Sequence, residues 1–376
     1  MIRSTKWRAL AATAAASALV LSACGSDDTN GASDGEGDCT GTIAAFGAMS
    51  GPNAVLVVPA INAAQIAVDE FNEANDCDIK LEAEDTEGSG DKAVPLATAW
   101  ASRDDVVAVM GGAFSGETRA TKGIFQDAGI PMVSESATAD DLTQDPAAAV
   151  EVFHRVVPYD SFQAKAIVQF IQERGAKKVF VIGNSEEYGQ PLADTIAAGL
   201  GDLVVGTDKT QVGQTDFAPT VAKIKALGAD HVFYGGYVAE LTPLAAQIAD
   251  EGLDVPVFAG DGAYGDPISG AVVSCPCTPI EGSELGEKFR ERHGDMVPAY
   301  VNEGYMAATI ILEGIKEVGA DREALQEFIE NYEGTILGRE ISFDEFGDAS
   351  VPKTYYFYDG ADGTAYETLG ETTVEE

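Results

Sequence analysis

Short apolar stretches alternate with longer amphipathic stretches from about residue 40 onwards. The short stretches have the length of strands, and the longer ones repeat apolar residues every three or four positions, as helices do. The pattern predicts strands at residues 42–47, 79–85, 106–111 and 131–133, and helices at residues 55–75, 91–102 and 117–128. Strands separated by single helices form a parallel sheet with helices on both faces. We expect one such sheet from this part of the chain.

The rhythm is interrupted at residues 152–158 and then starts again. Further strands are predicted at residues 178–183, 203–209, 231–235, 257–260, 340–343 and 354–358, and further helices at residues 162–174, 191–200, 217–227, 240–251, 284–293, 300–317 and 322–331. If the chain is divided once, in the middle, neither half has enough strands and helices to form a complete doubly wound unit. The late helices must therefore complete the first unit, and the last strand must complete the second.

The expected fold is α/β, with two doubly wound parallel-sheet lobes and several crossings between them. The expected boundaries assign residues 39–157 and 279–337 to lobe 1, and residues 158–278 and 338–368 to lobe 2. With 376 residues, the chain is long enough for two full hydrophobic cores.

The first 38 residues do not follow this pattern. Basic residues precede an apolar run at residues 9–21, which is too short to span a bilayer as a permanent helix. The run ends in Leu-Ser-Ala-Cys, which resembles a bacterial lipobox, so we expect a signal peptide at residues 1–23 and lipidation of Cys24. A plain secretory signal is the alternative. Residues 24–38 lack large apolar side chains, as expected of a disordered tether, and no later stretch is apolar enough to span a membrane.

The chain is strongly acidic. Its 62 Asp and Glu residues exceed its 23 Lys and Arg residues, which gives a formal net charge of −39. Such a surface repels nucleic acids and anionic lipid headgroups, so no nucleic-acid partner is expected. The acidic residues are scattered rather than grouped in blocks, which favours a role in solubility over binding of a cationic partner.

Export places the remaining cysteines in an oxidising compartment. Cys39 and Cys77 each precede a predicted strand, and neighbouring parallel strands lie about 4.8 Å apart, a distance that a disulfide can bridge. We therefore expect them to pair. Cys275 and Cys277 either pair with each other or stay reduced. A metal site is a weaker alternative, because no further cysteine or histidine is spaced to complete it.

No motif supports catalysis. The three histidines have no serine or cysteine at a known nucleophile spacing, and the nucleophile-elbow and zinc-protease motifs are absent. A GxGxxG sequence occurs at residues 260–265, but Asp-Pro follows it instead of a helix, and Asp261 inside it would repel a pyrophosphate. We expect neither an enzyme nor a cofactor.

Candidate binding residues lie where predicted strands end, the edge at which doubly wound sheets bind ligands. The turns GGAFSGET (111–118) and SESATADDL (134–142) are small, rich in hydroxyls and lead towards helices, whose N-termini favour anions. Ser115 and Thr138 add hydroxyl donors there. Because neither turn contains a lysine or arginine, a single carboxylate fits better than a triphosphate. Alternatively, Ser115 only caps its helix.

The strand ends of the second half carry different groups. They are the stretches EEYG (186–189), YGGY (234–237) and GDG (260–262), which supply tyrosines and a carboxylate. Asp261 could accept an ammonium group, with a tyrosine ring beside it. Hydroxyls on one side and an acid with aromatic rings on the other favour a zwitterion with an apolar side chain.

Six segments occur in the order of a known family. They are GAMSGP (47–52), GGAFSGET, SATADDLT (136–143), EEYG, FYGGY (233–237) and FAGDG (258–262). The chain resembles the leucine/isoleucine/valine-binding protein family, the type I periplasmic solute-binding proteins of ABC transporters. The resemblance implies two lobes joined by three crossover segments that close about a hinge on an amino acid. It also implies ABC permease and ATPase subunits as partners, and an exported protein that is periplasmic or lipid-anchored to the outer face of the cytoplasmic membrane.

The resemblance also suggests a role for individual residues. Ser115 and Thr138 match the family positions that contact the ligand carboxylate. Ser136 and its neighbour Ala137 match positions near the ligand ammonium, and Asp261 matches the acidic partner of that ammonium. Tyr188 and Tyr237 match residues of the pocket wall. The chain departs from the family near the ligand side chain. Leu56 and Val57 lie where some members have an aromatic residue, and Phe114 replaces a cysteine of a family disulfide. A branched-chain amino acid is the favoured ligand, and an amide, a urea-like compound or an aromatic acid is the alternative ligand. The alternative classes of protein are a ligand-sensing module and a secreted amidase.

Overall fold

The structure is a computed structural model that describes residues 39–145 and 151–375. The expected signal peptide, the lipidation site at Cys24 and the tether lie outside the described residues.

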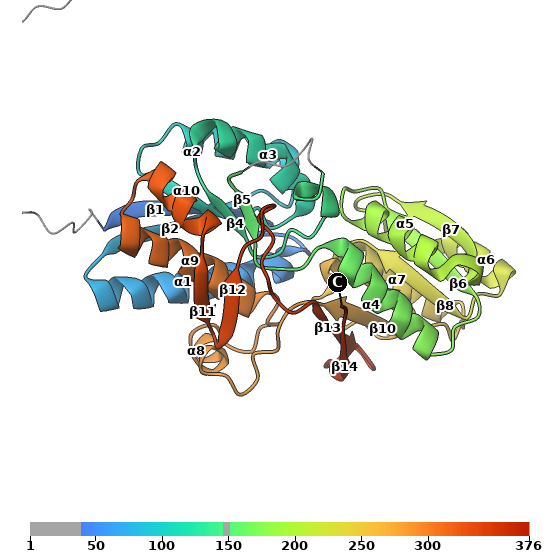
Figure 1. Cartoon of the computed structure of the whole chain (residues 1–376). Helices are drawn as coiled ribbons and strands as arrows, with labels where there is room; N and C mark the ends of the chain where they lie inside the picture. The colour runs from blue at the N-terminus through green and yellow to red at the C-terminus, as the bar shows by residue number, and fades with distance from the viewer. Residues whose placement is uncertain (1–38, 146–150, 376) are drawn as a thin grey trace, which may run out of the picture. The chain divides into compact units, whose positions relative to one another are not determined.

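The first lobe is built on a five-stranded parallel sheet with the strand order β2-β1-β3-β4-β5 (Figure 1). Its strands are β1 (Thr40–Gly47), β2 (Asp78–Asp85), β3 (Val106–Met110), β4 (Met132–Ser134) and β5 (Phe153–Arg155). Its helices are α1 (Ala54–Asn75), α2 (Gly90–Ala101), α3 (Ser115–Ala128), α8 (Glu284–His293), α9 (Val301–Val318) and α10 (Arg322–Glu330), with the short 3-10 helix η1 (Asp140–Leu142). The late helices thus complete the first unit, as the sequence predicts.

The central strand β1 shows why helices cover both faces of this sheet. Side chains alternate between the faces of a strand. Ile43 and Ala45 pack into a cluster formed largely by α1 and α9, whereas Ala44 and Phe46 pack into another cluster with residues of α2 and α3. All four are buried, so β1 is an apolar run without a polar face, as parallel sheets require.

Helices α1 and α9 lie in close contact. A Cβ atom on Gly304 would lie 2.3 Å from the carbonyl oxygen of Ala60, so only glycine permits this approach. Contrary to the sequence-based expectation, α1 is long and apolar enough to cross a membrane by length and composition, the one helix of this kind among the described residues. Half of the apolar stretch of α1 is buried inside the protein. Its apolar composition is therefore explained by its position as a core helix.

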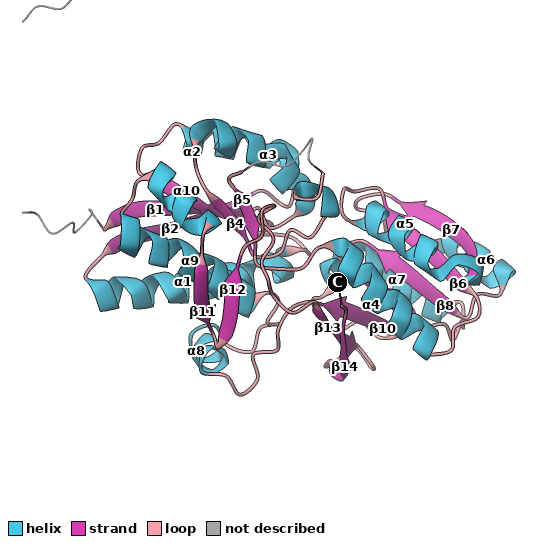
Figure 2. Cartoon of the chain, viewed as in Figure 1, coloured by secondary structure: helices cyan, strands magenta, loops and turns pink. Residues whose placement is uncertain are grey.

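The second lobe contains a seven-stranded sheet with the order β14-β13-β10-β9-β8-β6-β7 (Figure 2). Its strands are β6 (Val179–Asn184), β7 (Val204–Thr210), β8 (His231–Gly235), β9 (Val257–Ala259), β10 (Ala271–Cys275), β13 (Thr354–Asp359) and β14 (Glu367–Thr373). Its helices are α4 (Asp160–Glu173), α5 (Gly189–Leu200), α6 (Ala218–Leu227) and α7 (Val238–Asp250), with the 3-10 helices η2 (Gly201–Leu203) and η3 (Asp261–Ala263). Five strands are parallel, and β13 and β14 extend the sheet as antiparallel strands.

The chain passes between the lobes three times: after β5, after β10, and between β12 (Arg339–Ser342) and β13. Strand β12 pairs with β11 (Glu333–Ile336) in a hairpin. Ile341, Ala349 and Val351 pack into the core of the first lobe. The predicted boundary at residue 338 is therefore wrong for residues 338–351, because apolar contacts hold this stretch on lobe 1 until the third crossing.

Two disulfides are present among the described residues. Cys39 is bonded to Cys77, with their Cα atoms 5.1 Å apart, at the start of the neighbouring strands β1 and β2. Cys275 is bonded to Cys277 where the chain leaves β10 for the second crossing. The first pairing confirms the prediction made from strand spacing, and the second selects one of the two alternatives left open.

Candidate functional site: a cavity at the strand ends of both lobes

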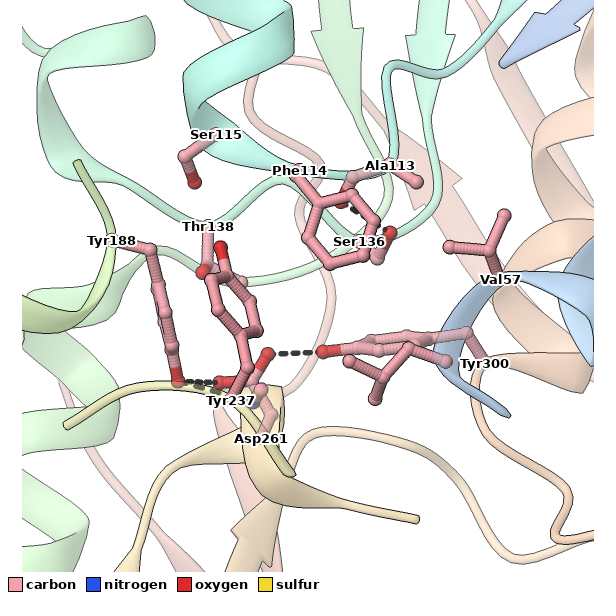
Figure 3. Close-up of a pocket in the computed structure, with 12 residues that line it drawn as sticks. Val57, Ala113, Phe114, Ser115, Ser136, Thr138, Tyr188, Tyr237, Asp261 and Tyr300 are labelled. Carbon is pink, nitrogen blue, oxygen red and sulfur yellow. Dashed lines mark hydrogen bonds between the residues drawn. The ribbon is translucent and has the colours of Figure 1, made fainter. Parts of the chain in front are cut away.

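A buried cavity lies where strands of both sheets end (Figure 3). Its volume is about 20 Å³. The residues that line it are Leu56, Val57, Ala113, Phe114, Ser115, Ser136, Thr138, Tyr188, Tyr237, Asp261, Gly262 and Tyr300. Most of them follow β3, β4, β6, β8 or β9 directly, which is the position where open α/β sheets bind ligands.

The lobe 1 wall contains the first residue of α3. The main-chain N–H groups of the first helical turn have no partner within the helix, and the helix dipole favours an anion there. Ser115 Oγ accepts a hydrogen bond of 3.2 Å from the Ala139 N–H, so its own proton remains available to a ligand. This bond also ties α3 to the segment that follows β4.

Hydroxyl groups shape that segment from within. Ser134 Oγ donates to the Gly112 carbonyl at 2.8 Å and accepts from the Ala137 N–H at 3.0 Å. Ser136 Oγ donates to the Ala113 carbonyl at 2.9 Å. The two turns that the sequence singled out are therefore bonded to each other and form one surface.

A buried carboxylate supports the start of α3. Glu117 accepts hydrogen bonds from the Phe114 N–H at 3.1 Å and from the Thr86 hydroxyl at 2.6 Å. Burial raises the pKa of Glu117 to about 8, although both hydrogen bonds oppose the shift. The side chain thus fixes the helix end without presenting a full negative charge to an anion at neutral pH.

The lobe 2 wall is organised around Asp261, the first residue of η3. Tyr188 Oη donates to Asp261 Oδ1 at 2.7 Å, and Tyr300 Oη donates to Oδ2 (Figure 3). Burial raises the pKa of Asp261, and the two phenols oppose that shift. Burial and the nearby carboxylates raise the pKa values of both tyrosines well above the usual range, so they remain protonated donors.

Gly262 is required by the close packing beside Asp261. A Cβ atom at this position would lie 2.7 Å from a ring carbon of Tyr188 and 2.9 Å from the Gly236 carbonyl oxygen. The GDG sequence therefore serves close packing around a carboxylate, and not a phosphate site.

Sequence reasoning missed Asp160, the first residue of α4. The side chain is 3% exposed, neither carboxylate oxygen has a hydrogen-bond partner, and the Asp160 N–H donates to the Thr138 carbonyl at 2.9 Å. Burial raises its pKa, and the charge of Asp261 raises it further. Burial of two carboxylates whose charges repel each other is costly unless a cation or a proton compensates them.

Tyr300 was also missed. It precedes α9 in a left-handed backbone conformation, with φ of 55°, and reaches Asp261 from the lobe 1 stretch between α8 and α9. Its only sequence signal was its place at the start of a long predicted helix, which does not indicate where the ring points.

The structure brings together seven of the eight predicted site residues on the cavity wall. The exception is Ala137, which is fully buried next to Ser136 and does not line the cavity. Phe114 lies edge-on to Tyr237, with ring centroids 5.2 Å apart, and Leu56 and Val57 complete an apolar side. The ring of Phe114 thus lies on the cavity wall, at the position where the family has a cysteine of its disulfide.

These features define a class of protein: two doubly wound lobes with a cavity at their strand ends, whose walls differ in polarity. The periplasmic binding protein family model matches residues 40–363. The chain belongs to this family.

Relatives of known type are similar over nearly the whole chain. The leucine-, isoleucine-, valine-, threonine- and alanine-binding protein of Pseudomonas aeruginosa is 26% identical over 334 residues, which cover 83% of this chain and 85% of that protein. Leu/Ile/Val-binding protein homolog 1 of Brucella abortus is 29% identical over 340 residues, covering 84% and 90%. The Leu/Ile/Val-binding protein of Escherichia coli is 26% identical over 341 residues, covering 86% and 92%.

Solved structures share the fold. The branched-chain amino acid transporter substrate-binding protein LivJ of Streptococcus pneumoniae, in complex with isoleucine, has a TM-score of 0.80 and 23% identity, covering 90% of this chain and 100% of that chain. A solute-binding protein of an ABC transporter from R. palustris, in complex with benzoate, has a TM-score of 0.76 and 18% identity, covering 90% and 98%. At these identities the likeness shows the fold and does not choose between the two ligands.

Proposed function

We propose that this protein is an extracytoplasmic solute-binding protein of an ABC importer that captures a free amino acid with an apolar side chain, a branched-chain amino acid being favoured. The single observation that carries the proposal is the opposite polarity of the two cavity walls. Hydroxyls and a helix N-terminus lie on one side, and Asp261 lies on the other; Asp160 is buried outside the lining, and its charge is coupled to that of Asp261.

The two walls match the two ends of an amino acid. The ligand carboxylate would take the Ser115 hydroxyl and the free N–H groups at the start of α3. The ligand ammonium would lie near Asp261 and Asp160, whose burial is costly as long as no cation meets them. A neutral or purely anionic ligand leaves the two carboxylates uncompensated.

The remaining wall is apolar and suits an aliphatic side chain. Leu56 and Val57 from α1 face the rings of Phe114 and Tyr237. Burial of a leucine, isoleucine or valine side chain against them would contribute about 1.5–3 kcal/mol to the binding free energy.

Capture would proceed by hinge closure. The ligand first meets the hydroxyls of lobe 1, and lobe 2 then brings Asp261, Tyr188 and Tyr237 onto it. Only the closed form satisfies both ligand charges, so the ligand shifts the equilibrium towards closure. The permease and ATPase subunits of the importer would receive the closed form. No chemical step and no cofactor are needed.

Membrane attachment would come from the lipobox cysteine. Conversion of Cys24 to a lipidated N-terminus would anchor the protein to the outer face of the cytoplasmic membrane. A Cys24→Ala variant should then appear in the soluble extracytoplasmic fraction, whereas an unaltered distribution would contradict the anchor.

The direct test is a thermal-shift screen of the chain starting after Cys24, which contains the whole compact unit 37–376. The screen would contain the common amino acids, short amides, urea and aromatic acids. A ligand at about 100 times its dissociation constant stabilises the folded state by about 2.7 kcal/mol. A shift with leucine, isoleucine or valine supports the proposal. A shift confined to benzoate-like acids or neutral amides overturns it, and calorimetry would then define the alternative ligand.

A further inference from the structure

A fully buried arginine lies behind the ligand-facing wall of lobe 1. Arg155, the last residue of β5, is 0% exposed, and its guanidinium group reaches two parts of the chain that are far apart in sequence. One is the stretch after β4 that carries Ser136 and Thr138, here named the 136–142 segment. The other is the stretch around Asp348 that precedes the third crossing.

The bonds to the 136–142 segment go to its main chain. Arg155 Nη1 donates to the Ala137 carbonyl at 3.2 Å and to the Ala139 carbonyl at 2.8 Å. These two carbonyls flank Thr138, whose side chain lines the cavity. Both are therefore held on the side away from the ligand, and this fixes the path of the chain on either side of Thr138.

The remaining bonds go towards the third crossing. Arg155 Nε forms a buried ion pair with Asp348 Oδ1. Arg155 Nη2 donates to the Thr143 hydroxyl at 2.5 Å, and that hydroxyl donates on to Asp348 Oδ2 at 2.9 Å. Gln144 Nε2 also donates to Asp348 Oδ2, at 2.6 Å. Both oxygens of Asp348 and all three guanidinium nitrogens are thus satisfied, as a buried ion pair requires.

The main chain follows the same connection. The Arg155 N–H donates to the Gly347 carbonyl at 3.0 Å, and the Ala349 N–H donates to the Arg155 carbonyl at 3.1 Å. Figure 1 shows the stretch between β12 and β13 passing beside the end of β5, in agreement with this bridge. The first crossing begins directly after Arg155, so one residue joins the start of the first crossing, the stretch that precedes the third crossing and the ligand-facing segment.

We propose that Arg155 is a positioning residue, which sets the ligand-facing path of the 136–142 segment by tying it to the crossing segments through Asp348. The proposal rests on the proposed function, because it gives that segment its role in ligand binding. A lysine cannot replace this arrangement, since a single ammonium group lacks the planar fork that bonds two carbonyls, a hydroxyl and a carboxylate together.

The test compares Arg155→Lys and Asp348→Asn with Ile329→Ala, a control that opens a cavity in the buried face of α10 on the same lobe, far along the chain from the site. Calorimetry with L-leucine, L-isoleucine and L-valine is done well below each variant's melting temperature. We expect Kd to rise at least tenfold for Arg155→Lys and at least threefold for Asp348→Asn, and to stay within twofold for the control. Loss of stability with an unchanged Kd in both variants would reduce Arg155 to a structural role and overturn the proposal.

A second readout needs no ligand and separates this proposal from the proposed function. Amide hydrogen exchange across residues 136–142 should be faster in both Arg155 network variants and unchanged in Ile329→Ala. Faster exchange in Arg155→Lys alone would show that the tie to Asp348 is not used and would overturn the proposal. If the wild-type chain binds none of the three amino acids, the proposed function fails, and exchange still decides the role of Arg155. Thr143→Val, which removes only the bridging hydroxyl, replaces Arg155→Lys if that variant does not fold.

Discussion

The two walls of the cavity differ in how they are built. The lobe 1 wall consists of small hydroxyl side chains and main-chain groups fixed by short local hydrogen bonds, such as those of Ser134 and Ser136. The opposite wall consists of the Asp261 carboxylate and large rings whose positions depend on distant parts of the chain, as in the bonds of Tyr188 from lobe 2 and Tyr300 from lobe 1 to Asp261. An anion site can be assembled from turns, whereas a buried acid needs partners from several elements.

The largest expected effect comes from Asp261 on the lobe 2 wall and from the buried Asp160, whose charge is coupled to it. Asp261→Asn or Asp160→Asn should each weaken amino-acid binding by about 3 kcal/mol, or roughly 100-fold, because the ligand ammonium would then be buried with one carboxylate fewer. Calorimetry with the best ligand of the screen measures this. Asp194→Asn is the control, an exposed acid on α5 of lobe 2 that accepts a hydrogen bond from Gln190. If Asp160→Asn binds the ligand as tightly as the wild type does, Asp160 does not contribute to ligand binding.

The lobe 1 wall should respond less. Ser115→Ala removes one hydroxyl donor and leaves the N–H groups of α3 in place, so we expect a loss of about 1.5 kcal/mol, or roughly tenfold. The decisive measurement compares the amino acid with its amide, which lacks the negative charge. If Ser115 contacts the ligand carboxylate, the variant loses affinity mainly for the acid. An equal loss for both compounds would indicate that Ser115 acts only as a helix residue.

The buried acids of the site predict the direction in which the affinity for an amino acid changes with pH. Burial raises the pKa values of Asp160 and Asp261 in the ligand-free protein, and a bound ammonium favours their ionised forms. Affinity for an amino acid is therefore full above the raised pKa values and falls as the pH drops through them, by up to about tenfold per pH unit for each proton taken up.

Titration calorimetry between pH 4.5 and 8 tests this sign, and the slope should be smaller in Asp261→Asn. The opposite trend, with tighter binding at lower pH, is the signature of an anionic ligand such as an aromatic acid, because protonated carboxyl groups no longer repel it.

The smallest expected effect lies at the rim, where Arg119 of lobe 1 pairs with Asp141 on its own lobe and with Glu187 of lobe 2. Glu187 is 56% exposed, so solvent screens the pair. Glu187→Gln should weaken binding no more than about fivefold, and the difference should vanish at high salt. Glu251→Gln removes an exposed ion pair that lies within lobe 2 and should have no effect on binding. A salt-independent loss would indicate a role other than an ion pair between the lobes.

The prediction from sequence was strongest where the structure depends on neighbouring residues. Most strands and helices lie within two residues of their predicted bounds, because each is specified by its own apolar spacing. The missed strands were short or paired late. Strand β5 has three residues, and β11 has four and forms by pairing with β12. Strand β10 lies in an apolar stretch without a clear period, and β14 is largely exposed and forms because β13 provides an edge.

The sequence by itself determined the α/β alternation, the turns at the strand ends and the pairing of Cys39 with Cys77. Each follows from local spacing and from the rule that parallel strands end at one edge. The tertiary structure alone decided which lobe holds residues 338–351, the approach of Tyr300 to Asp261, the burial of Asp160 and the position of Arg155 between two crossings. These features depend on segments that meet only after the chain has crossed between lobes, and no short-range pattern encodes such a meeting.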